Sequence, residues 1–173
     1  MWTKIEGFQQ LTRDEIAALV EAPALITILV GAADGELDSE ERNWSERLLR
    51  SRTYNKPNVL NEFYRAVVEG FWVKVQSEIT HLPTDMEVRN RELSERLSKL
   101  NPILAKIDAE LAADLYRGFL GLAEETAKAS GGFLRIGAIG AEENKWVKLP
   151  MLTPIAFTRI QTEDEAENDD WNN

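Results

Sequence analysis

The stretch "VGAADGELDSEERNWSERLL", from Val30 to Leu49, joins the end of an apolar segment to the start of a charged one. Gly35 suits the left-handed conformation that often ends a helix, and Asp38 or Ser39 offers an oxygen that caps the next helix. The stretch therefore predicts two helices joined by an acidic turn. Its carboxylates are also ligands for a hard cation, so a metal loop is the alternative interpretation.

Apolar residues recur at helical spacing along the rest of the chain. One series consists of Leu60, Phe63, Val67, Phe71, Val75 and Ile79. A second and longer series consists of Leu93, Leu97, Leu100, Leu104, Ile107, Leu111, Leu115, Phe119 and Leu122. Steps of three or four residues put one apolar stripe on one side of a helix, so both series predict core positions. Pro102 interrupts the second series and predicts that one helix ends there and another begins.

Helix starts are marked by an N-cap oxygen with a carboxylate three residues later. Three segments have this pattern: "TRDE" (Thr12–Glu15), "DSEE" (Asp38–Glu41) and "TDME" (Thr84–Glu87). No stretch alternates apolar and polar residues between hairpin turns, so a sheet has no support. We predict an all-α, single-domain bundle of about seven helices. Loops are expected near Asn55–Pro57, Leu82–Thr84 and Ser130–Gly140.

The charge of the chain is strongly negative and unevenly placed. The 173 residues carry a net charge of −10, which argues against nucleic acid or an anionic membrane surface as a partner. Six acids and no basic residue lie in the last twelve residues, "TEDEAENDDWNN". We therefore expect a folded domain over residues 1–161 and a disordered acidic tail over residues 162–173.

Several chemistries are excluded by composition. Without Cys there are no disulfides, thiolate zinc sites or cysteine nucleophiles. A single Glu-x-x-His pair, Glu78 and His81, is too little for a di-iron bundle, and His81 is better explained as the end of a helix. The glycines of "SGGFLRIGAIG" lack the Lys and Ser or Thr of a phosphate loop. The N-terminus lacks a signal-peptide pattern and no apolar run is long enough to cross a bilayer, so we expect a cytoplasmic protein.

The acidic turn matches only the first half of an EF-hand loop. Asp34, Glu36 and Asp38 stand at positions one, three and five, where calcium ligands are required. Ser39 replaces the glycine at position six, and Ser45 replaces the bidentate Glu at position twelve. A complete EF-hand is therefore rejected, whereas a weaker site for Ca²⁺ or Mg²⁺ and a purely capping role both remain open.

The second half of the chain contains a sequence similar to that of this turn. "SEERNW" (Ser39–Trp44) matches "AEENKW" (Ala141–Trp146) in two acids and a Trp, and "ADG" (Ala33–Gly35) aligns with "ASG" (Ala129–Gly131). Each copy follows an apolar segment. The pattern predicts a diverged pair of helix–turn–helix units, with Trp44 and Trp146 at equivalent places in the core.

The segment "AADGELDSEE" resembles the signature of the tellurite-resistance TerB-like family, in which an apolar helix is followed by "ADG" and then by a Glu that opens the next helix. The resemblance covers roughly residues 22–154. It implies an all-helical, non-enzymatic protein linked to stress resistance, whose acidic residues from both halves gather on one face and are proposed to bind metal.

Carried over residue by residue, the resemblance implies Asp34 and Glu41 from the first motif and Glu142 or Glu143 from the second. Together with the acids of the turn itself, the candidate metal ligands are Asp34, Glu36, Asp38, Glu41, Glu142 and Glu143. We expect no catalytic residue and no organic cofactor. A basic protein partner is an alternative ligand for the same acids.

Two other classes of function remain open. One is an enzyme that uses carboxylates with Mg²⁺ on a small phosphorylated substrate, which would also need Lys or Arg near the acids. The other is a pure protein-interaction module that works through the glycine-rich segment or the tail.

Overall fold

The computed structural model describes residues 5–31, 47–51, 58–131 and 145–156. Five helices have defined bounds there: α1 (Arg13–Gly31), α3 (Asn58–His81), α4 (Met86–Ser98), α5 (Leu100–Leu104) and α6 (Ala109–Gly131). Residues 47–51 and 145–147 are also helical, and no strand occurs within these described ranges. The all-α prediction is therefore confirmed. The acidic tail, Trp44 and the predicted turn around Asn55–Pro57 lie outside the described residues.

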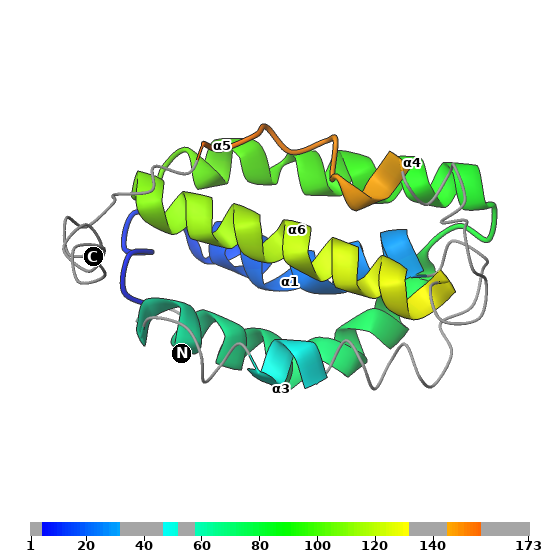
Figure 1. Ribbon diagram of the computed structural model, residues 1–173, viewed down its shortest axis with the longest axis horizontal. Coiled ribbons are helices and arrows are strands. Elements are labelled where there is room, and N and C mark those ends of the chain that lie inside the picture. Colours follow the sequence, from blue (N-terminus) through cyan, green and yellow to red (C-terminus); the bar gives the residue numbers. More distant parts are fainter. Residues whose placement is uncertain (1–4, 32–46, 52–57, 132–144, 157–173) are drawn as a thin grey trace, which may run out of the picture.

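The central element is α1, which contacts α3, α4, α5 and α6 (Figure 1). Every residue from Ala22 to Gly31 is buried. A helix that is apolar on all sides has to be surrounded, and "APALITILVG" has this character. The buried hydroxyl of Thr27 donates to the carbonyl oxygen of Pro23 at 2.9 Å, so it needs no partner outside the helix.

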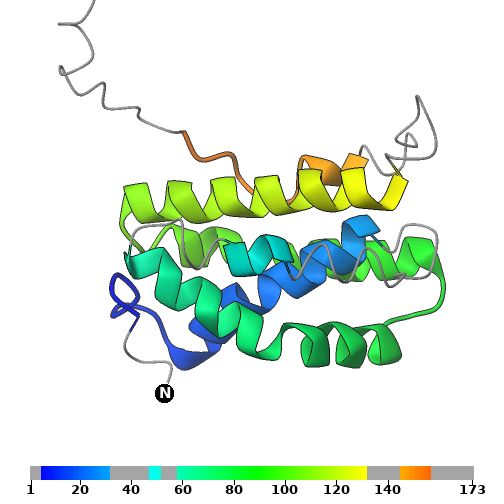
Figure 2. The ribbon, with the colours of Figure 1, turned by 60° about the horizontal axis from the view of Figure 1, so that its bottom comes forward.

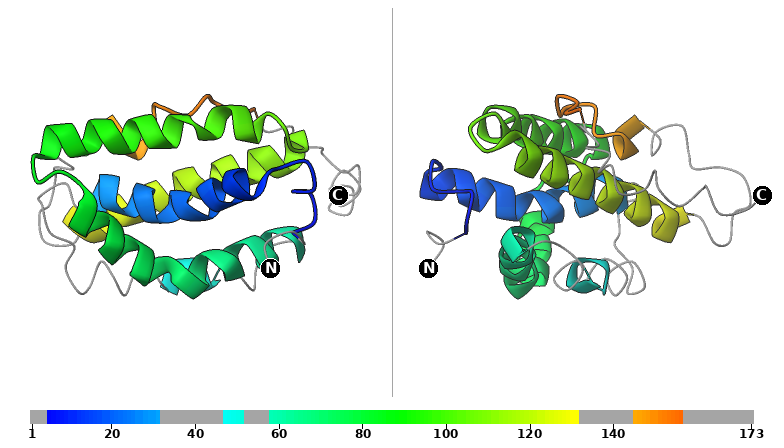
Figure 3. Two further views of the ribbon diagram at one scale, coloured as in Figure 1. Left: turned by 180° about the vertical axis from the view of Figure 1, so that it is seen from behind. Right: turned by 60° about the vertical axis from the view of Figure 1, so that its left-hand side comes forward.

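Three of the long helices run in the same direction. In Figures 1, 2 and 3, α1, α3 and α6 run from one end of the bundle to the other, whereas α4 returns in the opposite direction. The last residues of α1 and α6, Gly31 and Gly131, therefore lie at the same end of the bundle. The helical turn that begins at Lys145 also starts at this end in all three figures.

The apolar stripe of α3 forms a large part of the core. Its positions from Leu60 to Val75 are buried as predicted, and Phe63 has no exposed surface. The ring of Phe63 meets those of Phe8 from the N-terminal segment and Phe119 from α6 edge-on, with centroids 6.0 and 6.5 Å away. The prediction is wrong for Ile79, which is 42% exposed. The apolar stripe of α3 is therefore exposed in the last turns of the helix.

Two of the three predicted helix starts fall on described residues. The first is confirmed, because the amide of Thr12 donates to Glu15 Oε2 at 2.9 Å and the amide of Glu15 donates to Thr12 Oγ1 at 3.2 Å. The second, at Thr84, is wrong by one residue. Asp85 is the N-cap of α4, and its carboxylate accepts from the amide of Val88 at 2.9 Å. The third, at Asp38, lies outside the described residues.

The predicted break at Pro102 is also displaced. The chain leaves α4 at Ser98, and α5 includes Pro102 within its first turn. A proline is tolerated there because the first amides of a helix have no intrahelical acceptor. At the other end of the second series, α6 runs through Ser130 to Gly131, so the helix extends into the predicted loop. The loop predicted at Leu82–Thr84 is confirmed between α3 and α4.

The C-terminal described segment is fastened to α5 by one side chain. Asn101 donates through Nδ2 to the carbonyl oxygen of Met151 at 3.0 Å and accepts from the amide of Thr153 at 2.8 Å. Leu149 and Leu152, which are close in sequence to Met151 and Thr153, are buried in the core. Trp146 is partly buried and packs against the core. The equivalence of Trp146 and Trp44 stays a prediction. None of the described helices is both long and apolar enough to span a bilayer.

Candidate functional site

The six acidic residues predicted as metal ligands all lie outside the described residues: Asp34, Glu36, Asp38, Glu41, Glu142 and Glu143. Within residues 5–31, 47–51, 58–131 and 145–156, no group of three or more acids and histidines is arranged to hold a metal ion. The metal hypothesis thus depends on the chain segments that follow α1 and α6. Both helices deliver the chain to the same end of the bundle (Figure 1).

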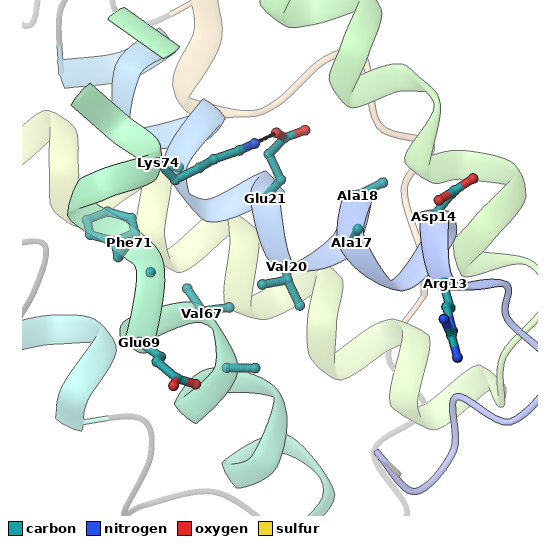
Figure 4. A pocket seen from close by; sticks show the side chains of 13 residues that line it. Arg13, Asp14, Ala17, Ala18, Val20, Glu21, Val67, Glu69, Phe71 and Lys74 are labelled. Atoms are coloured by element: carbon teal, nitrogen blue, oxygen red, sulfur yellow. Dashed lines mark ion pairs between the residues drawn. The ribbon is translucent and has the colours of Figure 1, made fainter. Parts of the chain in front are cut away.

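A groove of about 540 Å³ lies between α1 and α3 (Figure 4). Its apolar lining includes Ala17, Ala18, Ala24, Ala66, Val67 and Phe71. The groove exists because four of these residues are alanines, whose side chains do not fill the space between the two helices. Val67 and Phe71 are buried, so their side chains form the floor of the groove and also belong to the core.

Gly70 forms part of the α3 wall of the groove. A Cβ atom added at this position would meet no atom within 4 Å apart from its chain neighbours and the nearby backbone of its own helix. The glycine is therefore not required by close packing. Glycine is unfavourable in a helix interior by about 1 kcal/mol relative to alanine. Its effect here is to leave the wall open and the α3 backbone accessible.

Charged side chains surround the apolar lining. Arg13 and Asp14 stand where α1 begins, and Glu69 lies on the α3 side (Figure 4). Further along α1, Glu21 pairs with Lys74 across the groove, with Oε1 and Nζ 2.5 Å apart. An apolar floor with a charged rim is the usual composition of a surface that binds another molecule.

The Glu21–Lys74 pair belongs to a cluster of four alternating charges, which we call the ionic cluster: Glu21, Lys74, Glu78 and Arg96. Arg96 of α4 contacts Glu78 of α3 at 2.5 Å and Glu21 of α1 at 3.1 Å. Lys74 lies 3.5 Å from Glu78, one helical turn away. The ionic cluster joins α1, α3 and α4 where the groove ends.

The pKa values of Glu78, Arg96 and Lys74 are shifted toward the charged forms. The hydrogen bond from Arg96 lowers the pKa of Glu78 below its ordinary value of 4.5, although partial burial opposes this shift. The same bond raises the pKa of Arg96. The hydrogen bond with Glu21 raises the pKa of Lys74. The two acids are thus matched by two bases, and the cluster is a structural ion network.

Glu78 and His81, the Glu-x-x-His pair of the sequence, do not form a joint site. The carboxylate of Glu78 is engaged by Arg96 and Lys74. The exposed ring of His81 places Nδ1 2.6 Å from the carbonyl oxygen of Ser77, in the last turn of α3. The helix-ending role predicted for His81 is confirmed.

The comparisons with known proteins give no match. No family model, no curated protein and no solved structure is similar to the chain at a significant level. The TerB-like resemblance accordingly remains an expectation from the "ADG" motif.

Sequence reasoning missed both the groove and the ionic cluster. The only local signal for the cluster is the spacing of Lys74 and Glu78, which are four residues apart on one helix. Glu21 and Arg96 join them only through the packing of three helices. For the groove, the small residues Ala17, Ala18 and Gly70 gave a weak signal, because small residues also occur where helices pack closely.

Proposed function

We propose that this is a non-enzymatic, TerB-like binding protein whose acidic motifs, after α1 and after α6, together bind a divalent cation, Ca²⁺ or Mg²⁺. The observation that carries the proposal is the parallel arrangement of these two helices. Had α1 and α6 been antiparallel, their C-terminal ends would lie at opposite ends of the bundle. In Figures 1, 2 and 3 they share one end.

Short spacers connect two of the candidate ligands, Asp34 and Glu143, to this end. Asp34 follows Gly31 by three residues, and Glu143 precedes Lys145 by two. A chain spans at most about 3.5 Å per residue, so neither spacer reaches far from the helix to which it is attached. Because Gly31 and Lys145 belong to the same end of the bundle, we infer that acids of both halves act together. Carboxylates are the ligands that Ca²⁺ and Mg²⁺ prefer.

The test is the thermal stability of the protein with and without cation. A ligand that binds the folded state raises the melting temperature by mass action. Millimolar Ca²⁺ or Mg²⁺ should raise it for the wild-type protein, and the double variant Asp34→Asn, Glu41→Gln should lose that increase. The matched control is Glu95→Gln with Glu124→Gln, two exposed acids of α4 and α6.

Three outcomes contradict the proposal. One is no stabilisation and no heat of binding at millimolar cation. Another is equal stabilisation of the wild-type protein and the Asp34, Glu41 variant, which would indicate non-specific screening of charge. The third is Mg²⁺-dependent release of phosphate from a small phosphoester, which would favour a carboxylate enzyme.

A further inference from the structure

We propose that the groove between α1 and α3 is a docking site for a cationic amphipathic helix of another protein. The groove is a different surface from the end of the bundle at which α1 and α6 finish, and its binding of a helix does not depend on cation binding. All of the residues that line it are described by the structure.

The length of the groove suits a short helix. The α1 side runs from Arg13 to Ala24 and the α3 side from Ala66 to Lys74. At a rise of about 1.5 Å per residue, the α1 side is about 16 Å long, which equals three turns of a helix. Three turns present apolar residues at spacings of three and four on one face, the pattern by which helices bind in grooves.

The lining allows a partner helix to approach closely. Interaxial distances between packed helices depend on the side chains at the contact, and they are shortest where those side chains are small. Ala17, Ala18 and Ala66 project only a methyl group, and Gly70 projects nothing. Larger apolar side chains of the partner would therefore enter the groove and contact the floor formed by Val67 and Phe71.

The apolar surface extends beyond the groove. Val73 is 75% exposed, the highest value among the large apolar residues that the structure describes. It lies one helical turn after Gly70, so it continues the same face of α3. A small molecule confined to the groove would leave Val73 in water, whereas a docked helix can cover both. Exposed apolar surface next to a charged rim is typical of a protein-binding site.

The charges at the rim favour a cationic partner. Glu21 and Lys74 neutralise each other, which leaves Arg13, Asp14 and Glu69 to face the partner. This group has one basic and two acidic side chains, and the whole chain carries −10. Complementary charge speeds association and selects the partner. We therefore expect Lys or Arg to flank the apolar face of the docked helix.

The experiment uses a labelled peptide of about fourteen residues, with Leu at helical spacing and Lys elsewhere. Binding is followed by fluorescence anisotropy, and its location by amide chemical shifts in the full chain. The shifts should concentrate at Ala17, Ala18 and Gly70. Gly70→Gln, whose Cβ atom has room beside the groove and whose longer side chain would compete with the docked helix, should weaken binding about tenfold. The matched control Ala129→Gln, on an exposed position of α6, should bind as the wild type does.

Charge is tested separately from shape. Glu69→Lys should weaken binding by about threefold to tenfold, and Glu124→Lys, with the same change in net charge on α6, by clearly less. The same peptide with Glu in place of Lys should not bind. Equal affinity of Gly70→Gln and Ala129→Gln, shifts elsewhere in the chain, or no binding at millimolar peptide would overturn the proposal. Displacement of the peptide by lower concentrations of octylamine would instead indicate a small-molecule site.

Discussion

Arg96 of α4 donates a hydrogen bond of 2.5 Å through Nη1 to Oε2 of Glu78 in α3, and each of the two residues also contacts a second charged residue. Arg96 reaches Glu21 of α1, and Glu78 is next to Lys74, the partner of Glu21. Three helices are therefore joined through side chains that are only partly buried. Their contribution to stability depends on the protonation of the carboxylates.

The first prediction concerns acid pH. Because the folded-state pKa of Glu78 lies below its ordinary value of 4.5, its contribution is fully present above that value and is lost as the pH falls through the folded pKa. The stability of the wild-type protein should decline as the pH falls below about 4.5, and Glu78→Gln should show a shallower decline. Urea unfolding at several pH values measures both slopes.

The slope, rather than the absolute stability, decides this test, since Glu78→Gln also weakens the ion pairs at neutral pH. Glu95→Gln on the exposed face of α4 is the control and should keep the wild-type slope. Parallel pH profiles for the wild type and Glu78→Gln would refute the role of the ionic cluster. The pKa of Glu15 is also lowered, chiefly by its hydrogen bond with Lys106. Some decline in stability at acid pH should therefore persist in Glu78→Gln.

The second prediction compares two positions of the α3 stripe. Phe63→Ala should lower the free energy of unfolding by about 3–5 kcal/mol, because it removes a fully buried ring and leaves a cavity. Ile79→Ala should change it by no more than about 0.5 kcal/mol, as at most surface positions. Denaturant titration measures both values. A large cost at Ile79 would mean that the end of α3 is covered.

The third prediction separates two adjacent candidates for one helix cap. Asp85→Ala should cost about 1 kcal/mol, because the amide of Val88 loses its acceptor. Thr84→Ala should cost clearly less. The reverse order in thermal or chemical unfolding would mean that Thr84, and not Asp85, caps α4.

The fourth prediction concerns Gly70 without any partner present. Gly70→Ala should raise the free energy of unfolding by up to about 1 kcal/mol, because alanine favours the helix and the added methyl group meets no neighbour. A stabilised variant that still binds the cationic peptide would show that the glycine is not needed for the fold. Destabilisation would contradict the prediction, because it would mean that the added methyl group collides with a neighbouring atom.

The all-α fold class could be predicted because it depends on the spacing of apolar residues within short stretches of the chain. Phe63, Val67 and Phe71 repeat at four-residue intervals, and one face of α3 is buried accordingly. Helix ends were harder, since Thr84 and Asp85 are both good caps and only the course of the backbone chooses between them. The helix break predicted at Pro102 was misplaced for a related reason. Proline ends a helix that precedes it, but it is also accepted at the start of the next one.

The candidate groove could not be predicted because it depends on which faces of α1 and α3 meet. Ala17 and Gly70 are far apart in sequence, and nothing local shows that they line one hollow. The acids of the predicted metal turn are the opposite case. Their pattern is plain in the sequence, but whether Asp34 and Glu143 come together depends on chain segments outside the described residues.

The enclosure of α1 has a consequence for the synthesis of the protein. Its apolar segment from Ala22 to Gly31 is made before α6, one of the helices that cover it, which begins only at Ala109. At about 5–20 residues per second, a ribosome needs several seconds to produce the missing cover. During that interval the nascent chain presents a segment that attracts chaperones and other nascent chains. The yield of folded protein in a cell should therefore depend on how quickly α6 follows α1 out of the ribosome.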